Sequence, residues 1–321
     1  PYDTYERDAA GRVVRHETPW KGVTTYEYLG RTVVVQDPKH DFTVIENDPL
    51  GRPVSISSSG IATDAYVYGP FGWLESVTSP GGTITQSRDA FGRARTTTHP
   101  DRGATTTHYS GFGEPVKSID AAGRVTSLLY DRLARLIRRY DDDGTTIWKW
   151  DTATHGVGAL SLVKSPDGHT KTFTYDASGR PLSTTLTIGG ETFVASVGYD
   201  PWSRVDTITY PQGQGVTAFA VRNVYDHYGH LTAVRDATTH APYWQLSETD
   251  GAGRITRETL GNGLDTVRSY FPERDRVESI STNKQGAGFF FPKQSLAYTY
   301  DEKQNVVSRT DVAHAQSEHF R

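Results

Sequence analysis

The sequence predicts an all-β protein, in which tandem β-hairpins form one long, spiralling antiparallel sheet. Three observations lead to this prediction. A short phrase, Tyr-Asp-x-x-Gly-Arg, returns along the whole chain of 321 residues, and a second kind of turn signal lies between successive copies. The stretches between turns are short and rich in Thr, Val, Ile and Tyr. Such a regular repeat is typical of an array rather than of a compact domain with one active site.

The phrase is clearest at residues 175–180, 225–230 and 249–254. Its Asp position gives one marker for each copy, with other residues standing in for Asp at some of them. The markers are Asp8, Tyr28, Asp48, Gly69, Asp89, Ser110, Asp131, Asp151, Asp176, Asp200, Asp226, Asp250, Phe271 and Asp301. The spacing is about 20 residues in the first half and wider afterwards, which predicts about fourteen hairpin units.

The second turn signal consists of Gly and Pro clusters between the phrases. Examples are Pro80-Gly81-Gly82 and Gly261-Asn262-Gly263. A chain reversal is therefore expected about every 10 residues. The intervening segments, such as 171–175 and 182–188, alternate in polarity and are predicted to be strands, roughly 28 in all and about five residues long. A sheet of this length accumulates right-handed twist, which predicts the spiral.

Each residue type of the phrase has a structural role that its chemistry predicts. Asp can accept hydrogen bonds from backbone N–H groups two residues on, and Gly can adopt positive φ in a tight turn. Tyr is expected to pack against the next hairpin, and Arg to pair with a carboxylate or carbonyl of the neighbouring unit. We assign these roles to Asp8, Gly11, Arg12, Asp48, Gly51, Arg52, Asp89, Gly92, Arg93, Tyr130, Asp131, Tyr175, Asp176, Gly179, Arg180, Tyr199, Asp200, Tyr225, Asp226, Gly229, Asp250, Gly253, Arg254, Tyr300 and Asp301.

The domain organisation is predicted to be a single array over residues 1–321. No linker or change of composition divides the chain, and a hydrophobic content of 35% suits a one-layer sheet better than a two-layer sandwich. The chain opens at Pro1 and contains no Met, so we expect it to be a fragment of a larger protein. Open strand edges at its ends would allow association with a second copy.

Composition argues against several classes of partner. The formal net charge is −4, and Lys and Arg are scattered along the units, so nucleic acid is not an expected partner. No stretch approaches 18 consecutive apolar residues, so no membrane-spanning helix is expected. With 0 Cys, disulfides and thiolate metal sites are excluded.

The phrase, its period and the interleaved Gly and Pro turns resemble the Rhs/YD-repeat superfamily from about residue 5 to residue 311. Similar arrays occur in bacterial Rhs polymorphic toxins, in the B and C components of Tc toxins, in wall-associated bacterial proteins and in teneurins. The resemblance implies a β-hairpin ribbon wound into a hollow shell. In the toxin relatives, this shell encloses a toxic C-terminal polypeptide.

The toxin relatives end their shell with a DPxG-type boundary segment whose aspartates release the enclosed toxin. The nearest match here is Asp48-Pro49-Leu50-Gly51, which is followed by Arg52 and by further repeats, and we interpret it as an ordinary repeat turn. The chain is therefore expected to carry neither the protease nor the toxin, and we do not expect it to be an enzyme.

Other candidate sites have simpler interpretations. His227 and His230 form an H-x-x-H pair, but His230 occupies the Arg position of a phrase and no third ligand is evident. Asp141-Asp142-Asp143-Gly144 lacks the rest of an EF-hand loop and is expected to be a solvated turn. No Gly-x-Ser-x-Gly elbow is present. We predict no catalytic residue, no metal site and no cofactor.

Two segments depart from the regular period of the repeat. Residues 287–292 contain Phe289, Phe290 and Phe291 and are expected to form an extended hairpin tip that tucks into the shell wall or caps an opening, or alternatively a partner-binding loop. Residues 155–160 lie where the period lengthens to about 25 residues, which should alter the curvature of the array.

Two functions remain open from the sequence. The first is a segment of a secreted or exported toxin shell whose partners are the rest of its own polypeptide, namely further repeats and an enclosed C-terminal cargo. The alternative is an extracellular adhesion module that binds glycan or protein at the cell surface through exposed aromatic residues. The candidates are Trp73, Trp148, Trp150, Trp202 and Trp244, which are equally expected as cross-strand packing residues.

Overall fold

The structure is a computed structural model of the chain. It describes residues 2–18, 22–59, 61–212, 219–272, 275–284 and 292–320. The described residues form 29 strands that belong to one sheet, and they contain no helix. The predicted all-β class and the antiparallel hairpin sheet are therefore confirmed.

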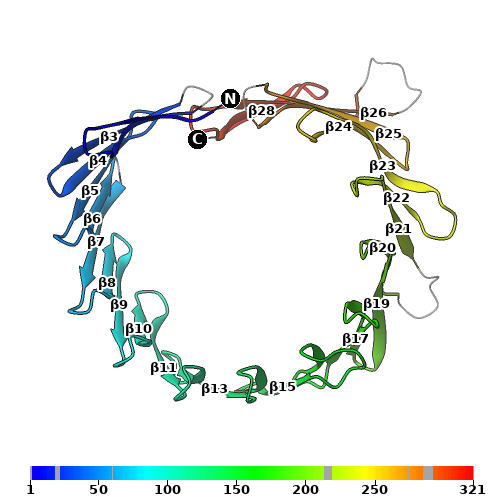
Figure 1. The fold of residues 1–321 in the computed structure, drawn as a ribbon, viewed down its shortest axis with the longest axis horizontal. Coiled ribbons are helices and arrows are strands. Elements are labelled where there is room, and N and C mark those ends of the chain that lie inside the picture. The colour runs from blue at the N-terminus through cyan, green and yellow to red at the C-terminus, as the bar shows by residue number, and fades with distance from the viewer. Residues whose placement is uncertain are drawn as a thin grey trace. The chain divides into compact units, whose positions relative to one another are not determined.

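The strands follow one another in chain order (Figure 1). Those from the N-terminus to the middle of the chain are β1 (Thr4–Arg7), β2 (Val13–Glu17), β3 (Val23–Leu29), β4 (Thr32–Gln36), β5 (Phe42–Asn47), β6 (Pro53–Ser58), β7 (Ile61–Tyr68), β8 (Leu74–Ser79), β9 (Gly82–Arg88), β10 (Ala94–His99), β11 (Gly103–Tyr109), β12 (Pro115–Ile119), β13 (Val125–Tyr130), β14 (Leu136–Asp141) and β15 (Gly144–Trp150).

The remaining strands are β16 (Leu160–Lys164), β17 (Thr170–Tyr175), β18 (Pro181–Ile188), β19 (Glu191–Tyr199), β20 (Val205–Thr209), β21 (Ala220–Tyr225), β22 (Leu231–Asp236), β23 (Pro242–Thr249), β24 (Ile255–Leu260), β25 (Leu264–Tyr270), β26 (Val277–Lys284), β27 (Gln294–Tyr300), β28 (Val306–Asp311) and β29 (Gln316–His319).

The chain divides into two compact units. The first comprises Pro1–Thr106 and Val267–Arg321, and the second comprises Thr107–Thr266. The boundaries fall within strands β11 and β25. Within each unit, consecutive strands pair antiparallel, as β3 does with β4 in the first and β18 with β19 in the second. A single array over residues 1–321 stays a prediction.

The turns of the sheet alternate between two rims because each strand reverses the direction of the one before. We call the turns that follow odd-numbered strands the YD rim, since every marker of the repeat lies at or beside one of them. The turns that follow even-numbered strands form the opposite rim. At the YD rim the strand register commonly shifts by a β-bulge, as between Gly198 and Tyr199. A bulge increases the local twist of the strand pair.

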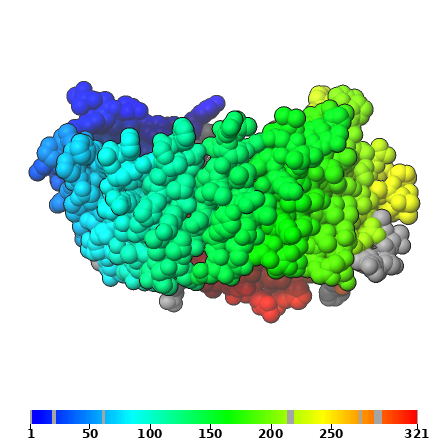
Figure 2. Space-filling model, turned by 90° about the horizontal axis from the view of Figure 1, so that it is seen from below, coloured from blue at the N-terminus to red at the C-terminus, as the bar shows by residue number. Residues whose placement is uncertain are grey.

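Few side chains are fully buried in this sheet. Among the described residues, Val221 and Ala233 are the buried hydrophobic ones. Strands such as β9 alternate between half-buried and exposed positions, which fits a sheet with solvent access on its faces. In Figure 2 the hairpins of the second unit lie side by side as a continuous layer of atoms. Cohesion must therefore come from contacts between neighbouring hairpins, which is where the repeated phrase lies.

Candidate functional site

The repeated phrase forms a five-residue turn closed by its Asp. In the turn at 176–180, the Asp176 Oδ1 atom accepts hydrogen bonds from the backbone N–H groups of Ser178 and Arg180, both at 2.9 Å. The Oδ2 atom accepts one from Arg180 Nε at 2.7 Å. Backbone hydrogen bonds from Gly179 to Asp176 and from Asp176 to Arg180 complete the turn.

The same closure recurs along the YD rim with different residues at the last position. Arg is the partner of Asp at 8–12, 48–52, 89–93, 131–135, 200–204 and 250–254. His230 takes this place opposite Asp226, and Asn305 opposite Asp301. The segment 48–51, which matches DPxG, is one of these ordinary turns. The turn thus tolerates exchange of the fifth residue where a hydrogen-bond donor is kept.

These contacts keep the turn carboxylates charged. The hydrogen bond from the Arg180 side chain, followed by that from its backbone N–H, holds the pKa of Asp176 below its ordinary value. The corresponding Arg side chain is also the main cause that lowers the pKa of Asp8 and of Asp120. Hydrogen bonds to the ionised form favour that form. The turns are therefore closed by ion pairs at neutral pH.

Tyr and Arg together connect each phrase to the adjacent hairpin. The Tyr199 hydroxyl donates to the Pro181 carbonyl at 2.8 Å, and the Arg180 guanidinium lies over the Tyr199 ring, 4.2 Å from its centroid. The carbonyl belongs to the residue that directly follows Arg in the preceding phrase. The same pair of contacts joins Arg12, Tyr28 and Val13, and also Arg204, Tyr225 and Val205.

This arrangement corrects two sequence-based expectations. Tyr contacts the preceding hairpin rather than the next, because antiparallel pairing places the end of β19 beside the start of β18. Arg was expected to pair with a carboxylate or carbonyl of the neighbouring unit, whereas it mainly pairs with the Asp of its own turn. The exception is Arg135, which also binds Asp151 at 2.6 Å. The hydrogen bonds to Asp151 and Asp131 raise the pKa of Arg135.

The Gly of the phrase serves two purposes. Gly92 has a φ of 81°, a conformation that other residues rarely adopt, and a Cβ atom there would lie 2.5 Å from the Trp73 ring. Trp73 occupies the Arg position of the preceding turn. A Cβ on Gly72 would likewise lie 2.9 Å from Arg52 Nη1. Gly92 and Gly72 thus suit both the turn and close packing by the adjacent unit, whereas Ala134, Ser203 and Gln304 adopt the same positive φ in other phrase turns.

Sequence reasoning missed Asp-closed turns on the opposite rim, such as those at Asp120 and Asp37, because it followed a period of about 20 residues. Asp120 and Arg124 close a turn on the opposite rim, with Arg124 Nε 2.7 Å from Asp120 Oδ2. Asp37 also closes an opposite-rim turn by accepting from the backbone N–H groups of Lys39 and Asp41. The Asp-x-x-Gly-Arg letters at 120–124 were a sufficient signal for the first of them.

The turn at 37–41 contacts a turn far away in the sequence. Both belong to the first unit. Lys39 Nζ lies 2.5 Å from Asp301 Oδ2, and Lys303 forms ion pairs with Asp37 and Asp41. Burial raises the pKa of Asp301, but the hydrogen bond from Lys39 and those from Asn305 outweigh it and lower the pKa to about 2. A phrase turn of the YD rim is thereby held against a turn of the opposite rim.

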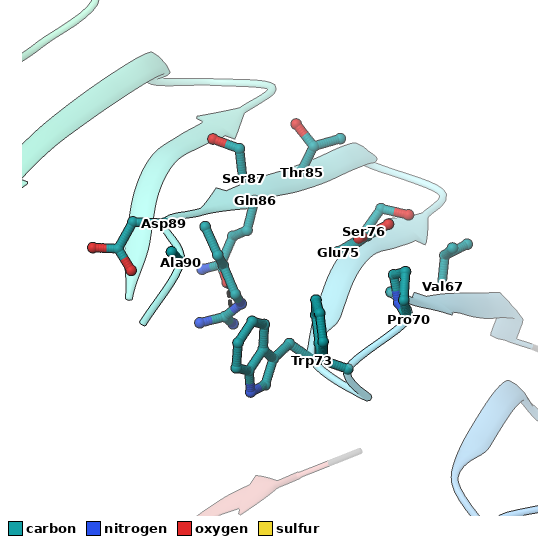
Figure 3. A pocket seen from close by; sticks show the side chains of 13 residues that line it. Val67, Pro70, Trp73, Glu75, Ser76, Thr85, Gln86, Ser87, Asp89 and Ala90 are labelled. Atoms are coloured by element: carbon teal, nitrogen blue, oxygen red, sulfur yellow. Dashed lines mark hydrogen bonds between the residues drawn. The ribbon is translucent and has the colours of Figure 1, made fainter. Parts of the chain in front are cut away.

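A hollow of about 700 Å³ lies between the turns at 69–73 and 89–93 in the first unit. Phe71, Trp73, Glu75, Gln86 and Arg88 contribute to its walls. Figure 3 shows Trp73 beside the strands that carry Glu75 and Gln86. The hollow combines aromatic rings with hydrogen-bonding groups, which is a composition suited to a small polar ligand.

The H-x-x-H and acidic candidates lie in ordinary turns. His230 Nδ1 is 3.1 Å from Asp226 Oδ2, while the His227 ring lies 3.6 Å from the Tyr228 ring, centroid to centroid. Asp141 pairs with Gly144 in the hairpin turn between β14 and β15 and forms an ion pair with Arg139 at 2.7 Å. Within the described ranges, no group of three or more potential metal ligands is found.

The remaining candidates are spread over both units. Trp202 is exposed, whereas Trp148 and Trp244 are half-buried and Trp150 donates to the Leu136 carbonyl at 2.9 Å. The Phe289–Phe291 run lies outside the described residues. Residues 155–159 belong to a longer YD-rim turn, in which Gly158 donates to Asp151 at 2.6 Å, and residue 160 begins strand β16. The described part of the chain contains no helix that is long and apolar enough to span a membrane.

Fold and repeat together define a β-hairpin array, and solved toxin structures share the fold of this array. The TcdB2-TccC3-TEV crystal structure matches with a TM-score of 0.82 and 20% identity over 97% of this chain and 18% of that chain. The TcdB2-TccC3 crystal structure matches with a TM-score of 0.82 and 19% identity over the same shares of the two chains. The structure of the Photorhabdus luminescens Tc holotoxin pore matches with a TM-score of 0.81 and 19% identity, over 97% of this chain and 18% of that chain.

One curated relative is detected by sequence. It is the double-stranded DNA deaminase toxin A of Burkholderia cenocepacia (strain H111), which is 28% identical over 278 residues, or 82% of this chain and 18% of the relative. No protein-family model matches the chain. The chain thus spans less than a fifth of the length of these relatives.

Proposed function

We propose that this chain is a stretch of the wall that a longer toxin polypeptide builds around its own C-terminal cargo. The observation that carries the proposal is the fold match to the TcdB2-TccC3 structures over 97% of the chain. The Burkholderia relative, a toxin by name, supports the same assignment over 82% of the chain. The parent polypeptide would be secreted or exported by a toxin-delivery system.

The physical character of the sheet supports a passive role. The Asp, Arg and Tyr residues of the phrase engage one another in turn closure and in joints between hairpins, as the Asp176, Arg180 and Tyr199 contacts illustrate. A wall of this kind retains a cargo by excluding volume and by weak contacts over a broad surface. We therefore propose that the toxic activity resides outside this segment.

Limited proteolysis of the full-length polypeptide tests the proposal. The region downstream of residue 321 should resist protease while the wall is intact. It should become susceptible once the polypeptide is cut or opened within the repeat array. Rapid digestion of the downstream region beside an intact array would contradict encapsulation. The downstream coding sequence gives a second check, because the proposal expects a DPxG boundary segment followed by a non-repetitive domain.

The hollow beside Trp73 favours a second candidate function, a glycan- or protein-binding module at a cell surface. Trp73 is 38% exposed and Phe71 is 79% exposed, so both rings can reach a ligand. A glycan-array screen with wild type and Trp73→Ala tests this candidate. Saturable binding that the substitution abolishes would support it, and absence of binding by the wild type would refute it.

A further inference from the structure

The phrase turns hold one side chain away from the sheet, at the position two residues after Asp. In three successive phrase turns of the first unit this position is occupied by Leu50, Phe71 and Phe91, which are 77%, 79% and 81% exposed. We call these three residues the YD-rim ridge. The second unit repeats the feature at Phe112 and Leu133, which are 95% and 71% exposed.

Turn closure does not explain why these side chains are apolar. Toward the turn's carboxylate, the residue at this position contributes its backbone N–H, and Ala10, Ser178 and Lys303 do so as well as Phe91. The Phe71 ring also lies 5.4 Å from the Trp73 ring and the Phe91 ring 5.1 Å from the Arg93 guanidinium of its own turn, yet both rings stay largely exposed. Successive YD-rim turns are two strands apart, or about 10 Å, so the apolar side chains form a row. A row of large exposed apolar residues commonly marks an interaction surface.

One phrase turn in the first unit shows what this position can contact. Lys303 stands two residues after Asp301 and forms ion pairs with Asp37 and Asp41 on the opposite rim. Its side chain is only 33% exposed, and the adjacent Gln304 is 9% exposed. A YD-rim turn therefore docks on an opposite-rim turn through the very position that carries the ridge.

The opposite rim offers apolar groups that suit aromatic side chains. Pro80 and Pro100 are exposed in consecutive opposite-rim turns of the first unit, and Pro38 lies in the docked turn. The Pro100 ring lies against the turn before it, since a Cβ on Gly82 would be 2.8 Å from Pro100 Cβ. Pyrrolidine rings provide rigid apolar surface, on which a Phe ring can pack without loss of a hydrogen bond.

We infer that the YD-rim ridge is a docking surface for the opposite rim of another stretch of these hairpin repeats. When the chain is studied alone, that partner is a second copy. Leu50, Phe71 and Phe91 of one copy contact the proline-bearing turns at 80–81 and 100–102 of the other. The arrangement of the two copies would resemble that of the docked turns at 37–41 and 301–305, with apolar contacts in place of the ion pairs. The inference is independent of any cargo.

Self-association of the 321-residue chain tests this inference. Because the contact joins two different rims, it is head-to-tail, and the average mass in sedimentation velocity should rise continuously with concentration. Phe71→Asp with Phe91→Asp should raise the apparent Kd roughly tenfold or more.

Val194→Asp is the matched control, since Val194 is 45% exposed on strand β19 away from both rims. Circular dichroism establishes that each variant is folded, and Phe71→Gln with Phe91→Gln replaces the Asp pair if it is not.

A mixing experiment tests the polarity of the contact. The ridge variant retains its opposite rim, and a Pro80→Asp, Pro100→Asp variant retains its ridge. Each should associate weakly alone, whereas an equimolar mixture should form a one-to-one dimer that does not extend. A monomeric wild type at all concentrations would overturn the inference. So would association that survives both sets of substitutions, because that result identifies strand-edge pairing through β1 or β29 instead.

Discussion

At the scale of single residues, the Asp of the phrase performs two separable tasks. Its Oδ1 atom accepts from two backbone N–H groups and fixes the path of the turn, as in Asp200 with Trp202 and Arg204. Its Oδ2 atom pairs with the fifth residue of the turn. Removing the charge should therefore abolish the ion pair while leaving an amide oxygen that can still accept from the backbone.

We predict that Asp176→Asn lowers the melting temperature by a few degrees at pH 7 and that this difference shrinks as the pH falls below 3.8. The pKa of Asp176 is lowered in the folded state, first by the Arg180 side chain and then by its backbone N–H. A carboxylate of this kind stabilises the fold above its ordinary pKa of 3.8, and the stabilisation is lost as the pH falls through the lower folded value. Thermal unfolding of both proteins between pH 7 and pH 2 measures the difference.

The control for this prediction is Asp143→Asn, which removes an exposed carboxylate from a turn on the opposite rim. Its melting temperature should stay close to that of the wild type across the same range. A difference between wild type and Asp176→Asn that persists unchanged at pH 2 would show that the charge is not what stabilises the turn.

At the scale of the element, each hairpin is joined to the preceding one by a Tyr hydroxyl and an Arg guanidinium. Tyr199 donates to Pro181 while its ring supports Arg180, and Arg180 in turn is oriented by Asp176. One Arg side chain therefore couples turn closure to hairpin stacking. This coupling gives a physical reason for Asp, Arg and Tyr to recur together.

We predict that Arg180 and Tyr199 are energetically coupled by about 0.5–1 kcal/mol, the range for an exposed cation–π contact. Tyr199→Phe keeps the ring and should destabilise the chain by about 1 kcal/mol through loss of the hydrogen bond to Pro181. Chemical denaturation of Arg180→Gln, Tyr199→Leu and the double variant completes the cycle. Strictly additive effects would contradict a direct contact between the two side chains.

Much of the element-scale picture follows from the sequence. The phrase letters and the Gly and Pro clusters predicted hairpins and an all-β sheet, because turn chemistry is local to a few residues. The partner of Arg was predicted wrongly for most units. The guanidinium of Arg180 contacts both Asp176 of its own turn and the Tyr199 ring, and the spacing of residues in the sequence does not indicate which of the reachable partners Arg binds. The Lys39 contact with Asp301 joins turns far apart in the sequence, and no local sequence pattern predicts it.

At the scale of the whole molecule, stability has to come from many similar local contacts. Val221 and Ala233 are the buried hydrophobic residues among those described, so a conventional core contributes little. Side-chain hydroxyl pairs across strands add to the cohesion, as between Thr174 and Ser183 at 2.6 Å. Stability in such an array is approximately a sum of unit and nearest-neighbour terms. A contact between distant units therefore has a disproportionate effect on the segments that it joins.

The ion pairs between the turns at 37–41 and 301–305 are such a contact, and we predict that Lys303→Glu increases hydrogen exchange of strands β27 and β28 severalfold. The substituted carboxylate would face Asp37 and Asp41, which now bind Lys303. Asp41→Lys should restore part of the protection, because the opposite charges are then exchanged. High salt should lower protection in the wild type, since partly exposed ion pairs are screened. Lys149→Glu, on the strand β15, serves as the control and should leave exchange in β27 and β28 unchanged. Unaltered exchange in Lys303→Glu would show that these ion pairs do not hold the C-terminal hairpins in place.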